Sequence, residues 1–545
     1  MVKNDFIKGL YILGILFSSS IVLAQETKLV VGIVVDQMRM DYMFRFENHY
    51  TDGGFKRFLN DGFVCFDAHY NYAPTYTGPG HASIYTGTTP SSHGIIANDW
   101  YDKYQKRKVY CSEDKTVKTL GNDGKAGEMS PKNMQSRTMT DALRLSNDFK
   151  SKVIGVSLKD RGSILPAGHA ANAAYWFDGG NGAFISSTYY MEKLPQWVND
   201  FNAEQKVSKY LSQDWNTLHP IETYTESAAD DNDFEAKYPG EVRPVFPHKL
   251  NTIRKKAGLG LISYTPFGNS LVLDFAKASI EKENLGKNPQ GVTDFLAMSF
   301  SSTDYIGHQF GPQSKEVQDT YIRLDKELEA FFNYLDERLG KGEYLVFLTA
   351  DHAAAENTAY LNQNKMPGKI FSAKEINKNL NDFFNKKFGI EEEWIENYSN
   401  EQYFFDREVV DKHKLDIKAL RELAADFLVQ QEGIAAAYPA HHLMYSYSQE
   451  QKFALMQNGF NFKMSGDVSV ILSPSWMDFM ATGTTHGSPY AYDTHIPIMF
   501  FGKNVPNGKT YKRYHITDIA PTVTQLLNIS YPDASTGVPI KEVFE

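Results

Sequence analysis

Six short runs of apolar, largely β-branched residues recur along the chain and limit its fold more than any other feature. Near-continuous apolar runs of this length are typical of strands in a parallel sheet that is covered on both faces. Helical patterns lie between several of them, including residues 317–339 and a capped helix that begins at Thr517 or Asp518. The pattern predicts an α/β fold, with a doubly wound, mostly parallel central sheet and helices on both faces. The six runs are residues 28–36, 151–158, 294–302, 343–351, 467–474 and 496–502.

Two long segments, residues 163–290 and 357–465, interrupt this alternation because they are polar, aromatic-rich and irregular. We expect them to be insertions that form walls or a cap over a site. The chain has 545 residues, of which 42% are hydrophobic, which is enough material for one large core. The sequence therefore predicts a single large domain at residues 25–545 that carries both insertions.

The amino terminus has the features of a secretory signal peptide. Lys3 and Lys8 precede a short apolar run at residues 10–23, and Val22 and Ala24 suit cleavage after residue 24. An uncleaved membrane anchor is the alternative, although the run is short for a membrane span. We therefore expect residues 1–24 to be removed, and the mature protein to be periplasmic or secreted without a membrane span.

The chain contains only two cysteines, Cys65 and Cys111. An oxidising compartment favours a disulfide between them. The sequence does not supply the Cα separation that a disulfide requires, so the free-thiol alternative stays open. Two cysteines are too few to form a thiolate metal site.

The formal net charge of the chain is −10. This charge argues against a nucleic-acid partner, because such partners usually demand a basic face. It does not exclude a small anionic substrate, since a metal ion or a local basic cluster can dominate the field at one site.

Aspartates and histidines follow several of the predicted strands. In open α/β sheets, ligands bind beyond the carboxyl ends of the strands, so we expect these side chains to meet at one edge. A single aspartate at a strand end is usually a helix cap or a turn residue, but six such residues together suffice for two metal sites of three ligands each. Three protein ligands and an open position are typical of catalytic zinc. The residues are Asp36, Asp304, His308, Asp351, His352 and His486.

The stretch YAPTYTGPGHAS at residues 72–83 is predicted to turn from a strand into a helix at the same edge. Pro79 suits a first helical turn, and Gly80 allows close approach of the backbone. The hydroxyl of Thr77 would lie at a helix amino terminus, where free N–H groups favour an anion. The alternatives are that Thr77 only caps the helix, or that Thr75 is the reactive hydroxyl.

Three further residues are candidates for binding the oxygens of an anion. Lys159 and Arg161 in SLKDRG are two positions apart, so in an extended chain they point the same way. An arginine matches phosphate oxygens with its planar fork, and a lysine adds a compact charge. Asn98 in IIANDW could add a neutral donor. The alternatives are a solvated surface pair and a turn residue.

These motifs resemble the alkaline phosphatase superfamily, and most of all its single-chain, phosphate-irrepressible alkaline phosphatases with a threonine nucleophile. The resemblance covers nearly all of residues 25–545. It rests on VVDQMR, PTYTGPGHAS, HGIIAND, SLKDRG, STDYIGH, TADHA, TTHGSPYAYDTHIP and TDIAPTVTQLL, in the order of the family.

The resemblance implies a monomeric enzyme with two zinc ions per chain. Thr77 matches the nucleophile, held by the second zinc, and Lys159, Arg161 and Asn98 match the phosphate-contacting residues. No magnesium is expected, because this branch has a lysine where dimeric relatives bind it. One zinc would be held by Asp304, His308 and His486, and the other by Asp36, Asp351 and His352.

The resulting hypothesis is a zinc-dependent phosphate monoester hydrolase that forms a phosphothreonine intermediate and releases inorganic phosphate. The alternative is a phosphodiesterase or nucleotide pyrophosphatase, which shares the metal ligands and threonine but lacks the Lys-x-Arg pair. A sulfatase is disfavoured, because the Cys-x-Pro-x-Arg sequence is absent and Cys65 is followed by FDAH. A non-catalytic binding protein is expected to have lost ligands, and all six are present. We expect His81, His93 and His495 to have structural roles.

Overall fold

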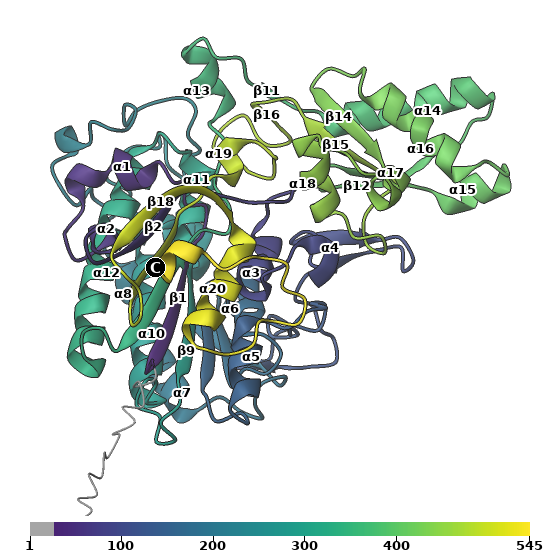
Figure 1. The fold of residues 1–545 in the computed structure, drawn as a ribbon. Coiled ribbons are helices and arrows are strands. Elements are labelled where there is room, and N and C mark those ends of the chain that lie inside the picture. The colour runs from purple at the N-terminus through teal and green to yellow at the C-terminus, as the bar shows by residue number, and fades with distance from the viewer. Residues whose placement is uncertain (1–26) are drawn as a thin grey trace, which may run out of the picture.

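The computed structural model describes residues 27–545, so the signal peptide predicted for residues 1–24 lies outside the described range (Figure 1). A ten-stranded sheet forms its centre. All of its strands except β17 and β8 run in one direction. The order across the sheet is β18 (Gly508–His515), β2 (Gly62–His69), β17 (Ile498–Gly502), β10 (Tyr344–Thr349), β1 (Leu29–Val35), β9 (Asp294–Phe300), β6 (Val153–Ser157), β7 (Ala173–Asp178), β8 (Ala183–Ser187) and β5 (Thr119–Leu120).

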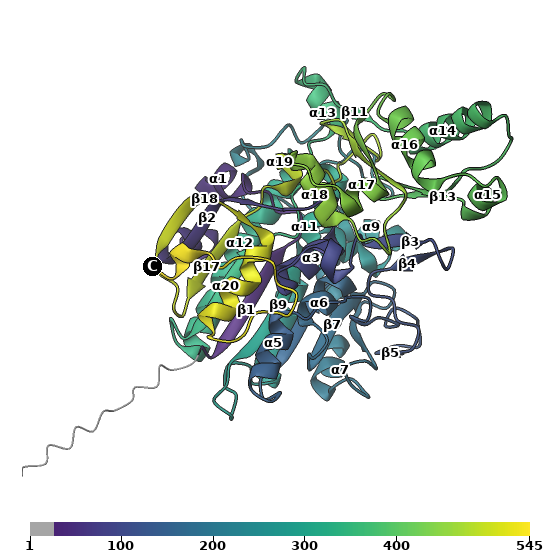
Figure 2. The same cartoon turned by 45° about the vertical axis from the view of Figure 1, so that its right-hand side comes forward.

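Helices cover both faces of this sheet, which confirms the predicted α/β architecture (Figures 1 and 2). Every residue of β1, β9 and β10 is buried, as a sheet covered on both sides requires. One face carries α3 (Thr77–Thr86), α5 (Met139–Ser146), α6 (Asp160–Ala167) and α20 (Ile519–Leu526). The other carries α2 (Phe55–Asp61), α7 (Gln196–Ala203), α10 (Phe267–Lys282), α11 (Ser302–Phe310) and α12 (Lys315–Leu339).

The two predicted helices are present at the expected places. The helix predicted at residues 317–339 is α12, and the hydroxyl of Ser314 caps it by accepting from the N–H of Val317. The last helix, α20, begins after Asp518. The carboxylate of Asp518 does not cap it, because it accepts from the N–H groups of His515 and Val538.

A second, four-stranded antiparallel sheet lies beside the main one (green, Figures 1 and 2). Trp394, Phe384 and Leu380 are fully buried in its own hydrophobic cluster. Its strands are β12 (Ile395–Ser399), β13 (Gln402–Phe405), β15 (Val468–Leu472) and β14 (Ile434–Pro439). The helices around it are α14 (Ala373–Phe388), α15 (Arg407–Lys412), α16 (Ile417–Leu428), α17 (Ala440–Tyr445) and α18 (Gln451–Gly459).

The placement of residues 467–474 in the main sheet is wrong, because this run forms β15 of the second sheet. Val468 and Val470 face the cluster around Trp394, whereas Ile471 faces a different cluster with Phe453. Both faces of β15 are therefore buried. A strand buried on both faces reads as a continuous apolar run in either kind of sheet.

The segment 163–290 does not lie wholly outside the main sheet. The hairpin formed by β7 and β8 extends that sheet, and α10 packs against β9 and β6. Between β8 and α10 the chain forms α7, two further short helices and irregular segments. These helices are α8 (Lys206–Tyr210) and α9 (Leu250–Ala257).

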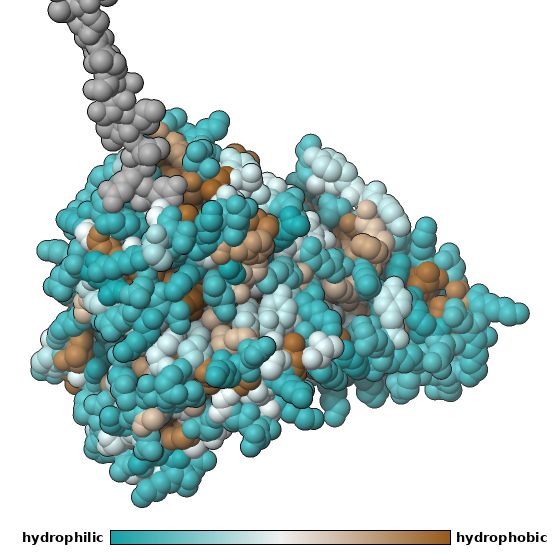
Figure 3. All heavy atoms as spheres, turned by 90° about the horizontal axis from the view of Figure 1, so that it is seen from below, coloured by the Kyte–Doolittle hydropathy of each residue, from teal (hydrophilic) through white to brown (hydrophobic). Residues whose placement is uncertain are grey.

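Shorter elements surround the sheets. They are the hairpin β3 (Asp99–Asp102) and β4 (Arg107–Tyr110), the pair β11 (Lys369–Ile370) and β16 (Trp476–Met477), and the helices α1 (Tyr42–Arg45), α4 (Pro90–His93), α13 (Thr358–Gln363) and α19 (Ala491–Thr494). The face of the molecule seen from below is mainly hydrophilic, with scattered hydrophobic residues (Figure 3). Within residues 27–545, no helix combines the length and the apolar character needed to cross a membrane.

The favoured disulfide between Cys65 and Cys111 is not formed. Cys65 lies on β2 in the main core, and Cys111 lies in a separate cluster with Trp100 and Met134. Both thiols are free and buried. Burial raises the pKa of Cys111 to about 12, so this thiol is unreactive at neutral pH.

We therefore expect both thiols to react with a thiol-specific chromogenic reagent only after unfolding. The unfolded protein, kept free of reductant, should release two equivalents of chromophore per chain, because both cysteines are free. The native protein should react slowly, because both thiols are buried. A yield near zero after unfolding would show that the cysteines are paired.

Candidate active site

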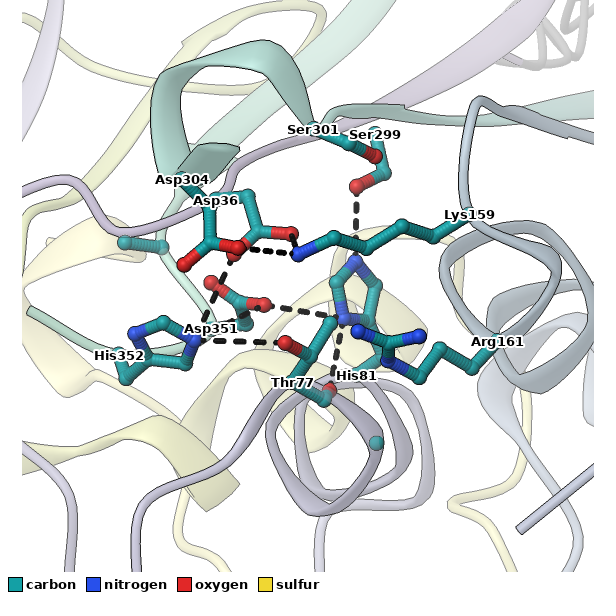
Figure 4. Close-up of polar contacts among 12 residues, drawn as sticks. Asp36, Thr77, His81, Lys159, Arg161, Ser299, Ser301, Asp304, Asp351 and His352 are labelled. Atoms are coloured by element: carbon teal, nitrogen blue, oxygen red, sulfur yellow. Dashed lines mark hydrogen bonds and ion pairs between the residues drawn. The ribbon is translucent and has the colours of Figure 1, made fainter. Parts of the chain in front are cut away.

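The predicted site residues converge at the carboxyl edge of the main sheet (Figure 4). Asp36 directly follows β1, Asp351 follows β10, and Asp304 lies in the first turn of α11 after β9. Lys159 follows β6 and precedes α6. Because β10, β1, β9 and β6 are parallel neighbours, their ends meet at one place.

The ammonium group of Lys159 lies between two of the carboxylates (Figure 4). Its Nζ donates to Asp36 Oδ2 at 2.7 Å and to Asp304 Oδ2 at 2.5 Å. The same Nζ lies 4.9 Å from the ring centroid of Tyr305. Lys159 is buried, so these contacts replace the water that the ammonium group loses.

The three aspartates differ in how easily they ionise. Burial, reinforced by the charge of Asp304, raises the pKa of Asp36 to about 6. Burial and the neighbouring Asp36 raise the pKa of Asp351 well above its ordinary value. Burial opposes ionisation of Asp304 too, but the charges of His308 and Lys159 outweigh it and hold that pKa well below the usual range. The site thus holds more negative charge than Lys159 alone can balance.

Asp304, His308 and His486 form one compact group whose nitrogen and oxygen atoms lie within 4.8 Å of one another. His308 Nε2 is 3.1 Å and His486 Nε2 is 3.8 Å from Asp304 Oδ1. The Nδ1 atoms are held by main-chain carbonyls, that of His308 by Thr484 at 2.7 Å and that of His486 by Thr75 at 2.6 Å. These bonds set the ring tautomers and leave both Nε2 atoms directed into the site, as metal-ligating histidines require.

A second group consists of Asp36, Asp304 and His352, with Asp351 beside it. His352 Nε2 lies 3.4 Å from Asp36 Oδ1 and 3.7 Å from Asp351 Oδ2. Asp36 Oδ1 and Asp351 Oδ2 are buried and accept no hydrogen bond within the described structure. Burial holds the pKa of His352 well below its ordinary value, so this ring is neutral and offers a lone pair. Unpartnered buried carboxylate oxygens beside neutral imidazoles fit divalent metal ions.

Thr77 is the first residue of α3, and it does not cap the helix. The N-cap position is Tyr76, and no side chain makes a capping hydrogen bond there. The Thr77 hydroxyl lies 3.4 Å from His352 Nε2 (Figure 4). Thr75 contributes its carbonyl to the orientation of His486, and its own buried hydroxyl has no hydrogen-bond partner in the described structure.

Asn98 and Arg161 approach Thr77 from two other segments. Asn98 Oδ1 accepts from the N–H of Gly78 at 2.7 Å, which leaves its NH₂ group as the available donor. One guanidinium nitrogen of Arg161 donates to Tyr110 Oη at 3.1 Å, and its Nε has no partner in the described structure. All ten predicted site residues therefore lie at one edge of the sheet.

Sequence reasoning missed the residues that hold the predicted ones in place. Gln37 adopts a left-handed backbone conformation, with φ of 64°. Its side chain donates to Asp304 Oδ1 at 2.7 Å, and its N–H donates to Asp351 Oδ1 at 3.2 Å. Strained backbone of this kind is concentrated at functional sites. Gln37 lies in the VVDQMR motif, whereas Tyr110 has no signal in the sequence.

The histidines expected to have structural roles form hydrogen bonds around the site. His81 Nδ1 is 2.9 Å from the Thr77 carbonyl oxygen, and its Nε2 is 2.9 Å from Ser299 Oγ. His93 Nε2 is 2.9 Å from Ser83 Oγ. His495 Nε2 donates to the carbonyl of Phe66.

Comparison with known proteins places this chain among phosphoryl-transfer enzymes. The family model described as type I phosphodiesterase/nucleotide pyrophosphatase matches residues 30–489. A Myroides odoratus protein named calcium-transporting ATPase is 46% identical over 535 residues, 97% of each chain. Alkaline phosphatase PhoV of Synechococcus elongatus is 48% identical over 519 residues, 95% of this chain and 93% of the relative.

A solved structure shows the same fold. Alkaline phosphatase PafA of Elizabethkingia meningoseptica is 44% identical over 541 residues, 98% of each chain. The crystal structure of wild-type PafA matches with a TM-score of 0.92 and 44% identity, covering 95% of this chain and 99% of that one.

Gly80 is the position in α3 where a side chain is least tolerable. A Cβ there would lie 2.3 Å from the carbonyl oxygen of Asp351 and 2.8 Å from its Cβ. We expect Gly80→Ala to lower the free energy of unfolding by about 1–3 kcal/mol, because α3 or the Asp351 segment must move. Urea denaturation measures this change.

Gly260→Ala is the matched control, because a Cβ at Gly260 meets its nearest atom at 3.8 Å. We expect it to change the free energy of unfolding by about 0.5 kcal/mol or less. Equal effects of the two substitutions would contradict the close approach of α3 to Asp351.

Proposed function

This chain belongs to the type I phosphodiesterase/nucleotide pyrophosphatase family, and we infer from this membership the mechanism by which it acts as an alkaline phosphatase. We propose that it hydrolyses phosphate monoesters with two zinc ions and a phosphothreonine intermediate at Thr77. The observation that carries the proposal is the meeting of Thr77, Lys159 and Arg161 with two groups of metal-ligand side chains.

The residues present fit two divalent metal ions. Asp304, His308 and His486 would hold one ion. Asp36, Asp351 and His352 would hold the other, and both unpartnered buried oxygens, Asp36 Oδ1 and Asp351 Oδ2, belong to this set. When bound, zinc ions supply Lewis acidity, which lowers the pKa of a hydroxyl or a water and stabilises a leaving alkoxide.

Thr77 would carry the nucleophilic step. Its Oγ gives its proton to solvent water and attacks phosphorus, so that an Oγ–P bond forms while the bond between phosphorus and the leaving oxygen breaks. The departing alkoxide takes up a proton from water to leave as the alcohol. Thr77 lies at the start of α3, whose dipole favours an anion there, although the Gly78 N–H is engaged by Asn98 and Pro79 has none. Water then cleaves the Oγ–P bond, which releases inorganic phosphate and restores Thr77.

Three other side chains would bind the phosphoryl oxygens. Lys159 and Arg161 provide positive charge, and the NH₂ group of Asn98 provides a neutral donor. Tyr110 positions the guanidinium group of Arg161 through its hydroxyl. A terminal phosphoryl group carries more negative charge than the phosphoryl group of a diester, so this set of donors favours monoesters.

A phosphodiesterase is the second candidate, and the description of the matching family model favours it. The cationic side chains of Lys159 and Arg161 argue against a phosphodiesterase, because a diester has one fewer charged oxygen to bind. We further propose that the protein is exported and acts on small phosphate monoesters outside the cytoplasm. The amino-terminal motif at residues 1–24 supports this proposal.

The role of Thr77 is tested by its replacement. Thr77→Ala should lower kcat for phenyl phosphate by about 1,000-fold or more, because the nucleophile is removed. The zinc content should stay the same, since three protein ligands remain for each ion. Thr75→Val removes the competing hydroxyl but keeps the carbonyl that holds His486, so its kcat should fall by less than about tenfold. A Thr77→Ala enzyme with near-normal turnover would rule out the phosphothreonine step.

Substrate class is tested by comparing phenyl phosphate with methyl phenyl phosphate. We expect a higher kcat/KM for the monoester, and we expect Arg161→Ala to lower it by about 100-fold or more while the diester changes less. Arg137→Ala is the control, because the exposed side chain of Arg137 pairs with Asp533, which is not a residue of the site. A native enzyme that prefers the diester would establish the phosphodiesterase instead.

A further inference from the structure

A cavity that is partly open to solvent lies between the second sheet and loops at the carboxyl edge of the main sheet, and it begins beside the reaction site. Tyr76, the residue before Thr77, and His486 form one end of it. Residues of β15 and β16 also line it, as does Met456 of α18, which is labelled in Figure 2. Loops at the carboxyl edge of the main sheet and β15 of the second sheet thus enclose it together.

The cavity is acidic. Glu401, Asp478 and Asp493 line it, and among the described residues that line it none is lysine or arginine. Asp493 is only 1% exposed. Its Oδ2 accepts from the N–H of Ser488 at 2.8 Å, and its buried Oδ1 has no hydrogen-bond partner in the described structure. A buried carboxylate oxygen without a partner is costly unless a ligand meets it.

The neighbouring charges do not satisfy this carboxylate. Arg39 is the cation that acts on Asp493, and it is already paired with Asp41 at 2.7 Å and Glu356 at 2.5 Å. Glu401 Oε2 accepts from Tyr76 Oη at 2.8 Å, and burial raises the pKa of Glu401 to about 7. Both carboxylates would ionise more readily if a cation entered the cavity.

Aromatic rings supply the rest of the lining that a cation needs. Tyr76, Trp476 and Tyr492 border the cavity together with the apolar side chains of Met456 and Ile471. Rings of this kind attract ammonium groups through their π faces, and quaternary ammonium ligands are recognised by such surroundings. A metal ion fits less well, because the lining is largely apolar.

The cavity is also placed where the alcohol of a substrate would lie. His486 belongs to the group with Asp304 and His308, whereas Thr77 lies at the other group beside His352, so the leaving-group oxygen would lie on the side of His486. An alcohol attached to that oxygen can extend past the His486 ring into the cavity. We propose that the cavity binds the leaving alcohol of phosphate monoesters whose alcohol carries an ammonium group, with Asp493 and Glu401 facing the cation. This inference rests on the proposed function.

The test compares two esters that differ only in charge. Choline phosphate carries a quaternary ammonium group, and 3,3-dimethylbutyl phosphate has the same shape with carbon in place of nitrogen. We expect kcat/KM to be roughly tenfold or more higher for choline phosphate, from the cation–π and carboxylate contacts. Equal values for the two esters would overturn this inference alone. No hydrolysis of either ester, nor of phenyl phosphate, would overturn the proposed function and this inference with it.

Two isosteric variants locate the effect. Asp493→Asn and Glu401→Gln should each lower kcat/KM for choline phosphate several-fold more than they lower kcat/KM for 3,3-dimethylbutyl phosphate. Asp426→Asn removes one negative charge from the exposed face of α16, away from the cavity, and should change neither value. A preference for choline phosphate that survives in both cavity variants would show that the cation is bound elsewhere, and would overturn the assignment.

Discussion

The balance of charge around Lys159 is the constraint on which the rest of the site depends. One ammonium group contacts Asp36 and Asp304, and Asp351 lies close by with a buried oxygen that accepts no hydrogen bond in the described structure. Such a concentration of carboxyl groups in a buried place is stable only if some of them stay protonated or further positive charge is present. The neutral rings of His352 and His486 provide the lone pairs that a divalent cation requires. Bound metal ions would thus stabilise this edge of the main sheet as well as take part in its chemistry.

The fold brings Thr77, the proposed nucleophile, to this charge cluster through one close approach. α3 reaches the Asp351 segment because Gly80 has no side chain, and this places Thr77 beside His352. His81 holds the first turn of α3 in place, because its ring contacts both the Thr77 carbonyl oxygen and Ser299 Oγ. The second sheet and the separate β11–β16 pair complete the surroundings, because β15 and β16 line the cavity that begins at His486. In the proposed mechanism, specificity for the alcohol and reactivity toward phosphorus would therefore come from different parts of the structure.

Much of the main sheet could be predicted from the sequence, because its strands are buried on both faces and read as continuous apolar runs. The same property made β15 indistinguishable from them, although it belongs to the second sheet. The β7–β8 hairpin was hidden within an irregular segment for a related reason, since it breaks the alternation of strand and helix. The free thiols could not be foreseen either, because the separation of Cys65 and Cys111 depends on which layer each enters.

The sequence by itself determined which chemical groups meet. Residues that directly follow parallel strands must gather at one edge, so Asp36, Asp304 and Asp351 could be brought together from strand order alone. Only the tertiary structure decided how these groups are held and what surrounds them. Lys159 lies between the carboxylates of Asp36 and Asp304. Tyr110 contacts Arg161 and Gln37 contacts Asp304, although the members of each pair are far apart in the sequence. Such contacts depend on distances between separate elements, and a linear pattern carries no information about those distances.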